Sequence, residues 1–132
     1  MNPDRDLRNT IQRELVYEEV MKADDHPVAE TIYERIHASH PSLSRSTVYR
    51  NLKLLAEEGK IRSLSVPSGP VHFDRTLEAH YHIQCTRCGK VCDVTVAEEG
   101  NARLLYDAGF QDVRRMVIYQ GICPTCQKHA ET

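Results

Sequence analysis

Residues 44–59, SRSTVYRNLKLLAEEG, carry the clearest helix signals of this chain. The apolar residues Val48, Leu52 and Leu55 recur at the spacing of one helical face. Ser44 is a natural N-cap for the first turn, and the glycine at the end of the stretch is a typical helix terminator. The stretch therefore predicts a helix with one buried face and one polar face.

The polar face of this helix carries side chains that suit the reading of DNA. When the apolar residues point inward, Ser46, Arg50 and Lys53 fall on the opposite side and Tyr49 falls on its flank. Arginine can pair with a guanine edge or a phosphate, and a tyrosine ring can pack on a thymine methyl group. The alternative is an ordinary solvated face, because arginine and lysine are mostly exposed.

Two further helices and two strands surround this helix in the sequence. The first predicted helix covers residues 10–22, and the second begins at Pro27 and is stopped by Pro41. After the third helix the apolar period changes to two, so residues 61–66 and 71–74 are predicted as strands joined by a tight turn. This order of elements predicts a winged helix-turn-helix.

Composition and charge limit the possible classes of protein. The 132 residues carry a net charge of -2, which argues against a basic nucleic-acid tail. Residues 44–62 nevertheless hold five basic and two acidic residues, whereas residues 14–34 hold seven acidic residues and one lysine. No apolar run approaches the roughly 20 residues of a membrane span, and the start lacks the apolar stretch of a signal peptide. We therefore expect a cytoplasmic protein with no membrane partner.

Two CxxC pairs predict a zinc site. Cys85 and Cys88 form the first pair, and Cys123 and Cys126 form the second. Four thiolates make a closed tetrahedral site for structural Zn²⁺. Two redox pairs are the alternative, and the sequence disfavours it because neither pair is expected at the start of a helix that follows a strand. Cys92 is left over, and we interpret it as an ordinary small, partly buried residue, with a reactive thiol as the alternative.

The region around these cysteines is predicted to be a small α/β unit. Residues 91–96 and 113–123 read as strands, and Ala102, Leu105 and Tyr106 indicate a short helix between them. A unit of roughly 55 residues buries little core, so zinc and dimerisation through a strand edge would add stability.

Several imidazoles and carboxylates form a second group of possible metal ligands. His80 and His82 point to the same face if they lie on a strand, with Asp74 before them and Asp93 after them; His26 lies in the loop before the second helix. Histidines at this spacing are common on surface strands, so the pattern alone does not establish a metal site.

Taken together, these motifs resemble the ferric uptake regulator family, and most closely its peroxide-sensing branch. The resemblance covers nearly the whole chain. It rests on QR at Gln12 and Arg13, HPVAETIY from His26, STVYRNLKLLAEEGKI from Ser46, HFD from His72, HYHIQCTRCGKVCD from His80 and IYQGICPTC from Ile118.

The resemblance implies an α+β chain with a winged-helix DNA-binding domain in residues 1–74 and a zinc-stabilised dimerisation domain in residues 75–132. It implies a homodimer that represses transcription from a pseudo-palindromic double-stranded DNA operator. It also implies a regulatory Fe²⁺ or Mn²⁺ ion, because a set of imidazoles and carboxylates suits these ions. The implied ligands are His26, Asp74, His80, His82 and Asp93.

Asp93 points to the peroxide-sensing branch, since iron-sensing relatives more usually have glutamate at the matching place. In that branch an iron-dependent reaction with hydrogen peroxide oxidises a liganding histidine, here expected at His26 or His80. An iron- or manganese-responsive regulator without peroxide sensing is the alternative. A non-haem metalloenzyme and a protein-binding zinc module are more distant ones, and we expect no enzyme.

The chain departs from the family pattern at its start. Only about ten residues precede Gln12, too few for the further helix of ordinary length that family members commonly have there. The sequence therefore suggests either a reduced DNA affinity or a flexible arm whose Arg5 and Arg8 contact phosphates.

Overall fold

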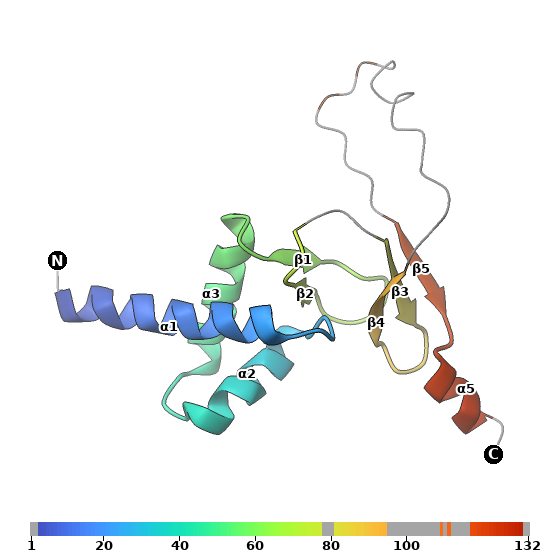
Figure 1. The fold of residues 1–132 in the computed structure, drawn as a ribbon, viewed down its shortest axis with the longest axis horizontal. Helices are drawn as coiled ribbons and strands as arrows, with labels where there is room; N and C mark the ends of the chain where they lie inside the picture. The colour runs from blue at the N-terminus through green and yellow to red at the C-terminus, as the bar shows by residue number, and fades with distance from the viewer. Residues whose placement is uncertain (1–2, 78–80, 95–108, 110, 112–116, 131–132) are drawn as a thin grey trace. The chain divides into compact units, whose positions relative to one another are not determined.

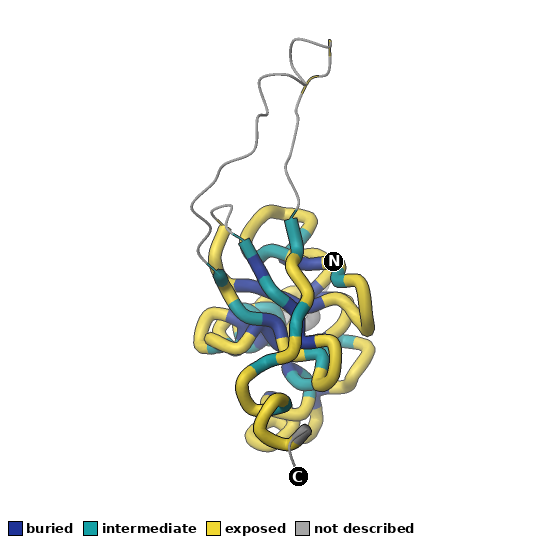
Figure 2. The backbone as a smooth tube through the Cα atoms, turned by 90° about the vertical axis from the view of Figure 1, so that its right-hand side faces the viewer, coloured by how far each residue is buried: buried dark blue, intermediate teal, exposed yellow. Residues whose placement is uncertain are grey.

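The computed structural model describes residues 3–77, 81–94, 109, 111 and 117–130 (Figure 1). The chain divides into two compact units, Met1–Ala79 and His80–Thr132. The sequence places the domain boundary after Asp74, and the units divide after Ala79. Buried residues occur in both units, for example Val48 in the first and His82 in the second. Figure 2 shows buried positions alternating with exposed ones along the backbone.

Three helices build the first unit, and each packs against the other two (Figure 1). They are α1 (Pro3–Lys22), α2 (Ala29–Ser39) and α3 (Arg45–Glu57). Their apolar faces meet in one core because each helix presents a stripe of aliphatic side chains. The buried core residues are Val16, Val20, Ile32, Ile36, Leu43, Val48, Leu52, Leu55, Ile61 and Phe73.

The helix predicted from residues 44–59 is confirmed, together with its two ends. The Ser44 side chain accepts a hydrogen bond from the Thr47 N–H at 3.2 Å, which satisfies a first-turn donor. At the other end Gly59 takes a φ of 74°, a left-handed conformation that favours glycine. The position of α3 along the chain is therefore fixed by local chemistry at both ends.

Helix α1 begins earlier than the sequence analysis predicted. It starts at Pro3 rather than at residue 10, so residues 3–9 continue the same helix, and the expected flexible arm is wrong. Proline is favoured at the first helical position, and the acidic Asp6 lies near the positive end of the helix dipole. These two start signals explain the additional turns.

Helix α2 begins later than predicted, because the preceding loop is tied to the wing. The carbonyl oxygen of Pro27 accepts a hydrogen bond from the Phe73 N–H at 2.8 Å, and Val28 forms an isolated bridge with His72. The helix therefore starts at Ala29, and Pro27 lies outside it.

The wing is a short antiparallel hairpin. Strand β1 (Arg62–Leu64) pairs with β2 (His72–Asp74), and Leu64 lies opposite His72. The hairpin follows α3 directly, as a winged helix requires. Both strands are shorter than the sequence analysis predicted.

The second unit contains a three-stranded sheet with the order β4-β3-β5. Strand β3 (Tyr81–Cys85) is central; it runs antiparallel to β4 (Val91–Val94) and parallel to β5 (Ile118–Gly121). Helix α5 (Pro124–Ala130) follows β5 and was not predicted. The helix predicted around Ala102, Leu105 and Tyr106 lies outside the described residues.

Among the described residues, no helix combines the length and apolar character that crossing a membrane requires.

Loss of the Ser44 cap should destabilise the first unit. We expect Ser44→Ala to lower the free energy of unfolding by about 1 kcal/mol, because the Thr47 N–H loses its acceptor. Urea unfolding followed by circular dichroism measures this change. Ser42→Ala, an exposed substitution before the helix, is the control. Equal stabilities of the two variants would contradict the role of the cap.

Candidate functional site

The four paired cysteines of the second unit converge on one point. Cys85 ends β3 and Cys88 lies in the turn after it, whereas Cys123 follows β5 and Cys126 lies in α5. Their sulfur atoms all lie within 4.8 Å of one another, and the Cys88 and Cys123 sulfurs are 3.9 Å apart. Sulfurs bound tetrahedrally at about 2.3 Å from Zn²⁺ would be about 3.8 Å apart. The donors and their spacing therefore fit structural zinc.

Backbone N–H groups already favour a thiolate in this cluster. The N–H groups of Cys88 and Cys123 point at the Cys85 sulfur from 3.5 and 3.4 Å, and they lower the pKa of this thiol to about 5. The neighbouring Cys123 sulfur raises the pKa of Cys126 to about 12. Converging thiolates repel one another, so a divalent cation is the natural charge that lets all four ionise.

The second CxxC pair does not lie where the sequence predicted, away from the start of a helix after a strand. Cys123 follows β5 and directly precedes α5, so this CxxC does lie at the start of a helix after a strand. The convergence of four sulfurs, rather than the location of either pair, therefore supports a structural metal site. Cys92 lies on β4 opposite Ile83 and is not one of the four.

The sheet of the second unit brings together one imidazole and one carboxylate. His82 and Asp93 are direct partners in the register of β3 and β4. The Nε2 atom of His82 lies 3.3 Å from Oδ1 of Asp93. His80, the other histidine expected on this strand, lies outside the described residues.

The first unit holds a second imidazole–carboxylate pair. The Nε2 atom of His26 lies 3.3 Å from Oδ2 of Asp74, although 48 positions separate the two residues along the chain. Asp74 is held by the Thr76 N–H, which donates to its Oδ1 at 2.9 Å. His26 takes a φ of 49°, in the left-handed region that non-glycine residues rarely adopt.

A residue that the sequence analysis did not single out supports His26. The carbonyl oxygen of His26 lies 2.6 Å from Nδ1 of the buried His72. Because a carbonyl can only accept, His72 carries its proton on Nδ1 in this contact. The loop of His26 is thus fastened to β2 through His72, beside the strand residue Asp74. Sequence reasoning used His72 only as part of a family motif.

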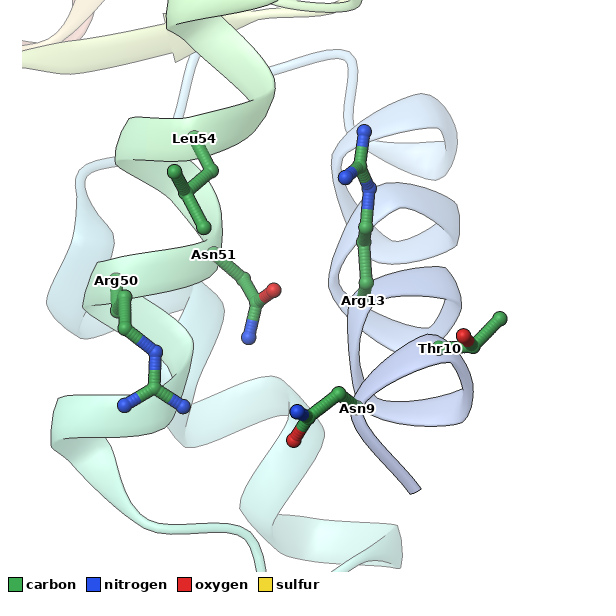
Figure 3. Close-up of a pocket in the computed structure, with 6 residues that line it drawn as sticks. All are labelled: Asn9, Thr10, Arg13, Arg50, Asn51 and Leu54. Carbon is green, nitrogen blue, oxygen red and sulfur yellow. The ribbon is translucent and has the colours of Figure 1, made fainter. Parts of the chain in front are cut away.

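The polar face of α3 is exposed, as the predicted DNA-reading residues require. Ser46, Arg50 and Lys53 are exposed, and Tyr49 is 41% exposed. Figure 3 shows a groove between α1 and α3, with Arg13 on one side and Arg50 on the other. Asn9, Thr10, Asn51 and Leu54 complete its lining. This groove presents two guanidinium groups next to hydrogen-bonding side chains.

The opposite flank of α3 is tied to α2 through Glu30. Arg45 donates to both carboxylate oxygens of Glu30, from Nε at 2.9 Å and from Nη2 at 2.8 Å. The Tyr49 hydroxyl also donates to Glu30, at 2.8 Å. Neither Glu30 nor Arg45 was singled out in the sequence, because nothing in it reveals which acid of α2 meets α3.

A chain that contains both a winged helix and a four-cysteine site that fits zinc belongs to a definable class, the metal-containing DNA-binding regulators. Comparison with known proteins specifies the family. The sequence profile of the Ferric uptake regulator family matches residues 4–119. The chain is 30% identical to the peroxide operon regulator of Bacillus subtilis strain 168 over 124 residues, which are 92% of this chain and 86% of that protein. It is 32% identical to the peroxide-responsive repressor PerR of Staphylococcus aureus strain Mu50, over 92% of this chain and 83% of that protein.

Solved structures of regulators from this family also match the fold of the chain. The Campylobacter jejuni peroxide stress regulator matches with a TM-score of 0.76 and 29% identity, over 93% of this chain and 94% of that chain. The Helicobacter pylori ferric uptake regulator Fur matches with a TM-score of 0.75 and 26% identity, over 88% of this chain and 79% of that chain. The chain belongs to the ferric uptake regulator family.

Family membership confirms several expectations from the sequence. The family consists of DNA-binding transcriptional regulators that act as dimers, so this chain is a regulator and not an enzyme. The predicted α+β architecture with a winged helix is confirmed as well.

Removal of zinc should unfold the second unit selectively. We expect a strong chelator to abolish the sheet of His80–Thr132, because this small unit depends on the four-sulfur site, while the helices of Met1–Ala79 persist on their own core. Circular dichroism and amide NMR spectra of the full chain follow both units. Cys126→Ser should lose bound zinc, and Cys92→Ser should keep it. Retention of zinc by Cys126→Ser would contradict the assignment.

Proposed function

We propose that this chain is a metal-dependent repressor, regulated by one Fe²⁺ or Mn²⁺ ion that joins its two imidazole–carboxylate pairs. The observation that carries the proposal is the existence of these pairs, His26 with Asp74 and His82 with Asp93, each already assembled within its own unit. His80 is the fifth proposed ligand, from the resemblance to the family.

The donor atoms suit such an ion. Two atoms that bind one ion at about 2.1 Å and a right angle lie about 3 Å apart, close to the 3.3 Å within each pair. Imidazoles with carboxylates favour Fe²⁺ or Mn²⁺, whereas the four thiolates favour Zn²⁺. The chain thus separates a structural and a regulatory metal by the chemistry of their ligands.

The distribution of ligands over two units supports regulation by the metal. His26 and Asp74 belong to Met1–Ala79, whereas His82 and Asp93 belong to His80–Thr132. An ion that binds all of them favours whichever arrangement of the units satisfies both pairs. In a homodimer, that arrangement would set two α3 helices in successive major grooves, roughly 34 Å apart, on a pseudo-palindromic operator. The proposed DNA-reading residues are Ser46, Tyr49, Arg50 and Lys53.

Hydrogen peroxide is the proposed signal. Two relatives are named as a peroxide operon regulator and a peroxide-responsive repressor, and Asp93 matches the pattern expected for that branch. Fe²⁺ bound at the site would supply one-electron chemistry with peroxide. In net terms one oxygen atom of peroxide is added to the imidazole of His26 or His80, and water is released. The modified ring would be a poorer ligand, so the remaining residues would hold the ion less tightly and repression would end.

A regulator that responds to iron or manganese levels is the second candidate. A solved manganese uptake regulator with bound zinc matches with a TM-score of 0.66 and 25% identity, over 85% of this chain and 87% of that chain. The same ligands would serve this function, so the response to peroxide separates the two.

A substitution in either pair should weaken metal-dependent DNA binding. We expect Asp74→Asn and His82→Ala each to raise the Mn²⁺ concentration needed for DNA binding by at least tenfold. Removal of a residue that only hydrogen-bonds a metal ligand already lowers metal affinity by about this factor. Fluorescence anisotropy with a duplex that the wild-type protein selects from a randomised library measures the response. His37→Ala, an exposed histidine of α2, is the control. A wild-type response in both pair variants would overturn the regulatory site.

Peroxide should end DNA binding only in the iron-loaded protein. We expect the Fe²⁺ form to lose affinity for the selected duplex as His26 or His80 gains one oxygen atom, detected by peptide mass spectrometry. The Mn²⁺ form should keep its affinity. If the iron form binds DNA unchanged with both histidines unmodified, the peroxide function is excluded and the metal-responsive candidate remains.

A further inference from the structure

Glu30 holds two residues of the proposed recognition helix at once. It lies in the first turn of α2, and its carboxylate accepts two hydrogen bonds from Arg45 and one from the Tyr49 hydroxyl. Arg45 also lies over the Tyr33 ring, with its guanidinium carbon 4.5 Å from the ring centroid. Four side chains from two helices therefore form one connected cluster.

The cluster gives each of its members a defined position. A two-point contact between a guanidinium and a carboxylate is planar and directional, so it fixes where the Glu30 oxygens lie. Arg45 is the first residue of α3, where a cation faces the positive end of the helix dipole, and the Glu30 carboxylate offsets that charge. The surface around Tyr49 is thus more ordered than an exposed tyrosine alone would be.

The hydrogen bond to Glu30 has a consequence for what Tyr49 can recognise. A tyrosine hydroxyl has one proton to donate, and here that proton points to the carboxylate. Toward any other partner the hydroxyl can then act only as an acceptor. In the major groove, the donors are the amino groups of adenine and cytosine, whereas guanine O6 and N7, thymine O4 and phosphate oxygens only accept.

We propose that Glu30 is a specificity-determining positioning residue, which keeps the Tyr49 hydroxyl as an acceptor for the amino group of adenine or cytosine. This inference rests on the proposed function, because it requires α3 to enter the major groove. Glu30 itself touches no base; it acts through Tyr49. Tyr49 then discriminates between bases through its hydroxyl group as well as through the apolar contact of its ring.

Base preference tests the proposal. Wild-type protein with Mn²⁺ first selects duplexes from a randomised library, and comparison with Tyr49→Phe identifies the base pair that the hydroxyl reads. At that pair we expect the preference of the wild type to depend on the amino group of the selected adenine or cytosine, so a duplex in which that base lacks its amino group should lose the preference. Glu30→Gln should reduce this preference by about three- to tenfold, the range for one ordinary hydrogen bond, because a neutral amide no longer fixes the tyrosine proton.

A double-mutant cycle separates positioning from charge. Adding Glu30→Gln to Tyr49→Phe should not reduce the preference further, because both changes remove the same interaction. Glu34→Gln is the matched control: it removes the same charge from an exposed position one turn further along α2. Glu34→Gln should raise the overall affinity for DNA, as Glu30→Gln does. It should leave the preference at the base pair read by Tyr49 within about twofold of wild type. A preference that Glu30→Gln leaves unchanged would overturn the inference.

A measurement without DNA tests the contact itself. The Glu30 carboxylate raises the pKa of the Tyr49 phenol, so Glu30→Gln should lower that pKa and Glu34→Gln should change it less. NMR titration of ring-labelled tyrosine resolves this residue, with Tyr49→Phe to assign its signal. An unchanged Tyr49 pKa would overturn the inference even if the repressor binds DNA. Failure of the wild-type protein to select any sequence would instead overturn the proposed function, and the inference with it.

Discussion

The apolar face of α3 is the constraint on which the DNA-binding unit depends. Val48, Leu52 and Leu55 are almost completely buried, so the helix cannot rotate without exposing them. Once this face is fixed, the helical period directs the other side chains of the helix. Asn51, Leu54 and the exposed Arg50 line the groove beside α1, Arg45 and Tyr49 point toward α2, and Ser46 and Lys53 point outward. Packing energy in the core thus determines which polar groups are presented to a partner.

The parts that could be predicted from the sequence are those governed by local rules. The bounds of α3 follow from a serine cap and a glycine end, and the two CxxC pairs indicate zinc because their spacing is itself the signal. The start of α2 was predicted too early because a distant contact determines it. The carbonyl oxygen of Pro27 accepts a hydrogen bond from the Phe73 N–H of β2. Helix α1 was predicted too short although Pro3 and the acidic first turn were visible start signals.

The pairing of the proposed metal ligands could not be predicted by local reasoning, and resemblance had to supply it. His82 and Asp93 meet because of a strand register, which the alternation of residues restricts but does not specify. His26 and Asp74 meet because a loop in a left-handed conformation is tied to the wing by His72 and Phe73. Each pair is therefore a product of how its own unit folds.

The ion pairs of the structure also change the interpretation of the charge pattern in the sequence. Residues 44–62 hold five basic residues, yet Arg45 is paired with Glu30 from the acidic segment that precedes it. Arg13, beside the groove, is paired with Glu58. With a net charge of -2, the chain has little unspecific attraction for phosphates. In the proposed repressor, affinity must then come from directional contacts made twice by a correctly arranged dimer. Under that proposal, weak background binding would allow a metal that sets the arrangement of the dimer to switch repression on and off.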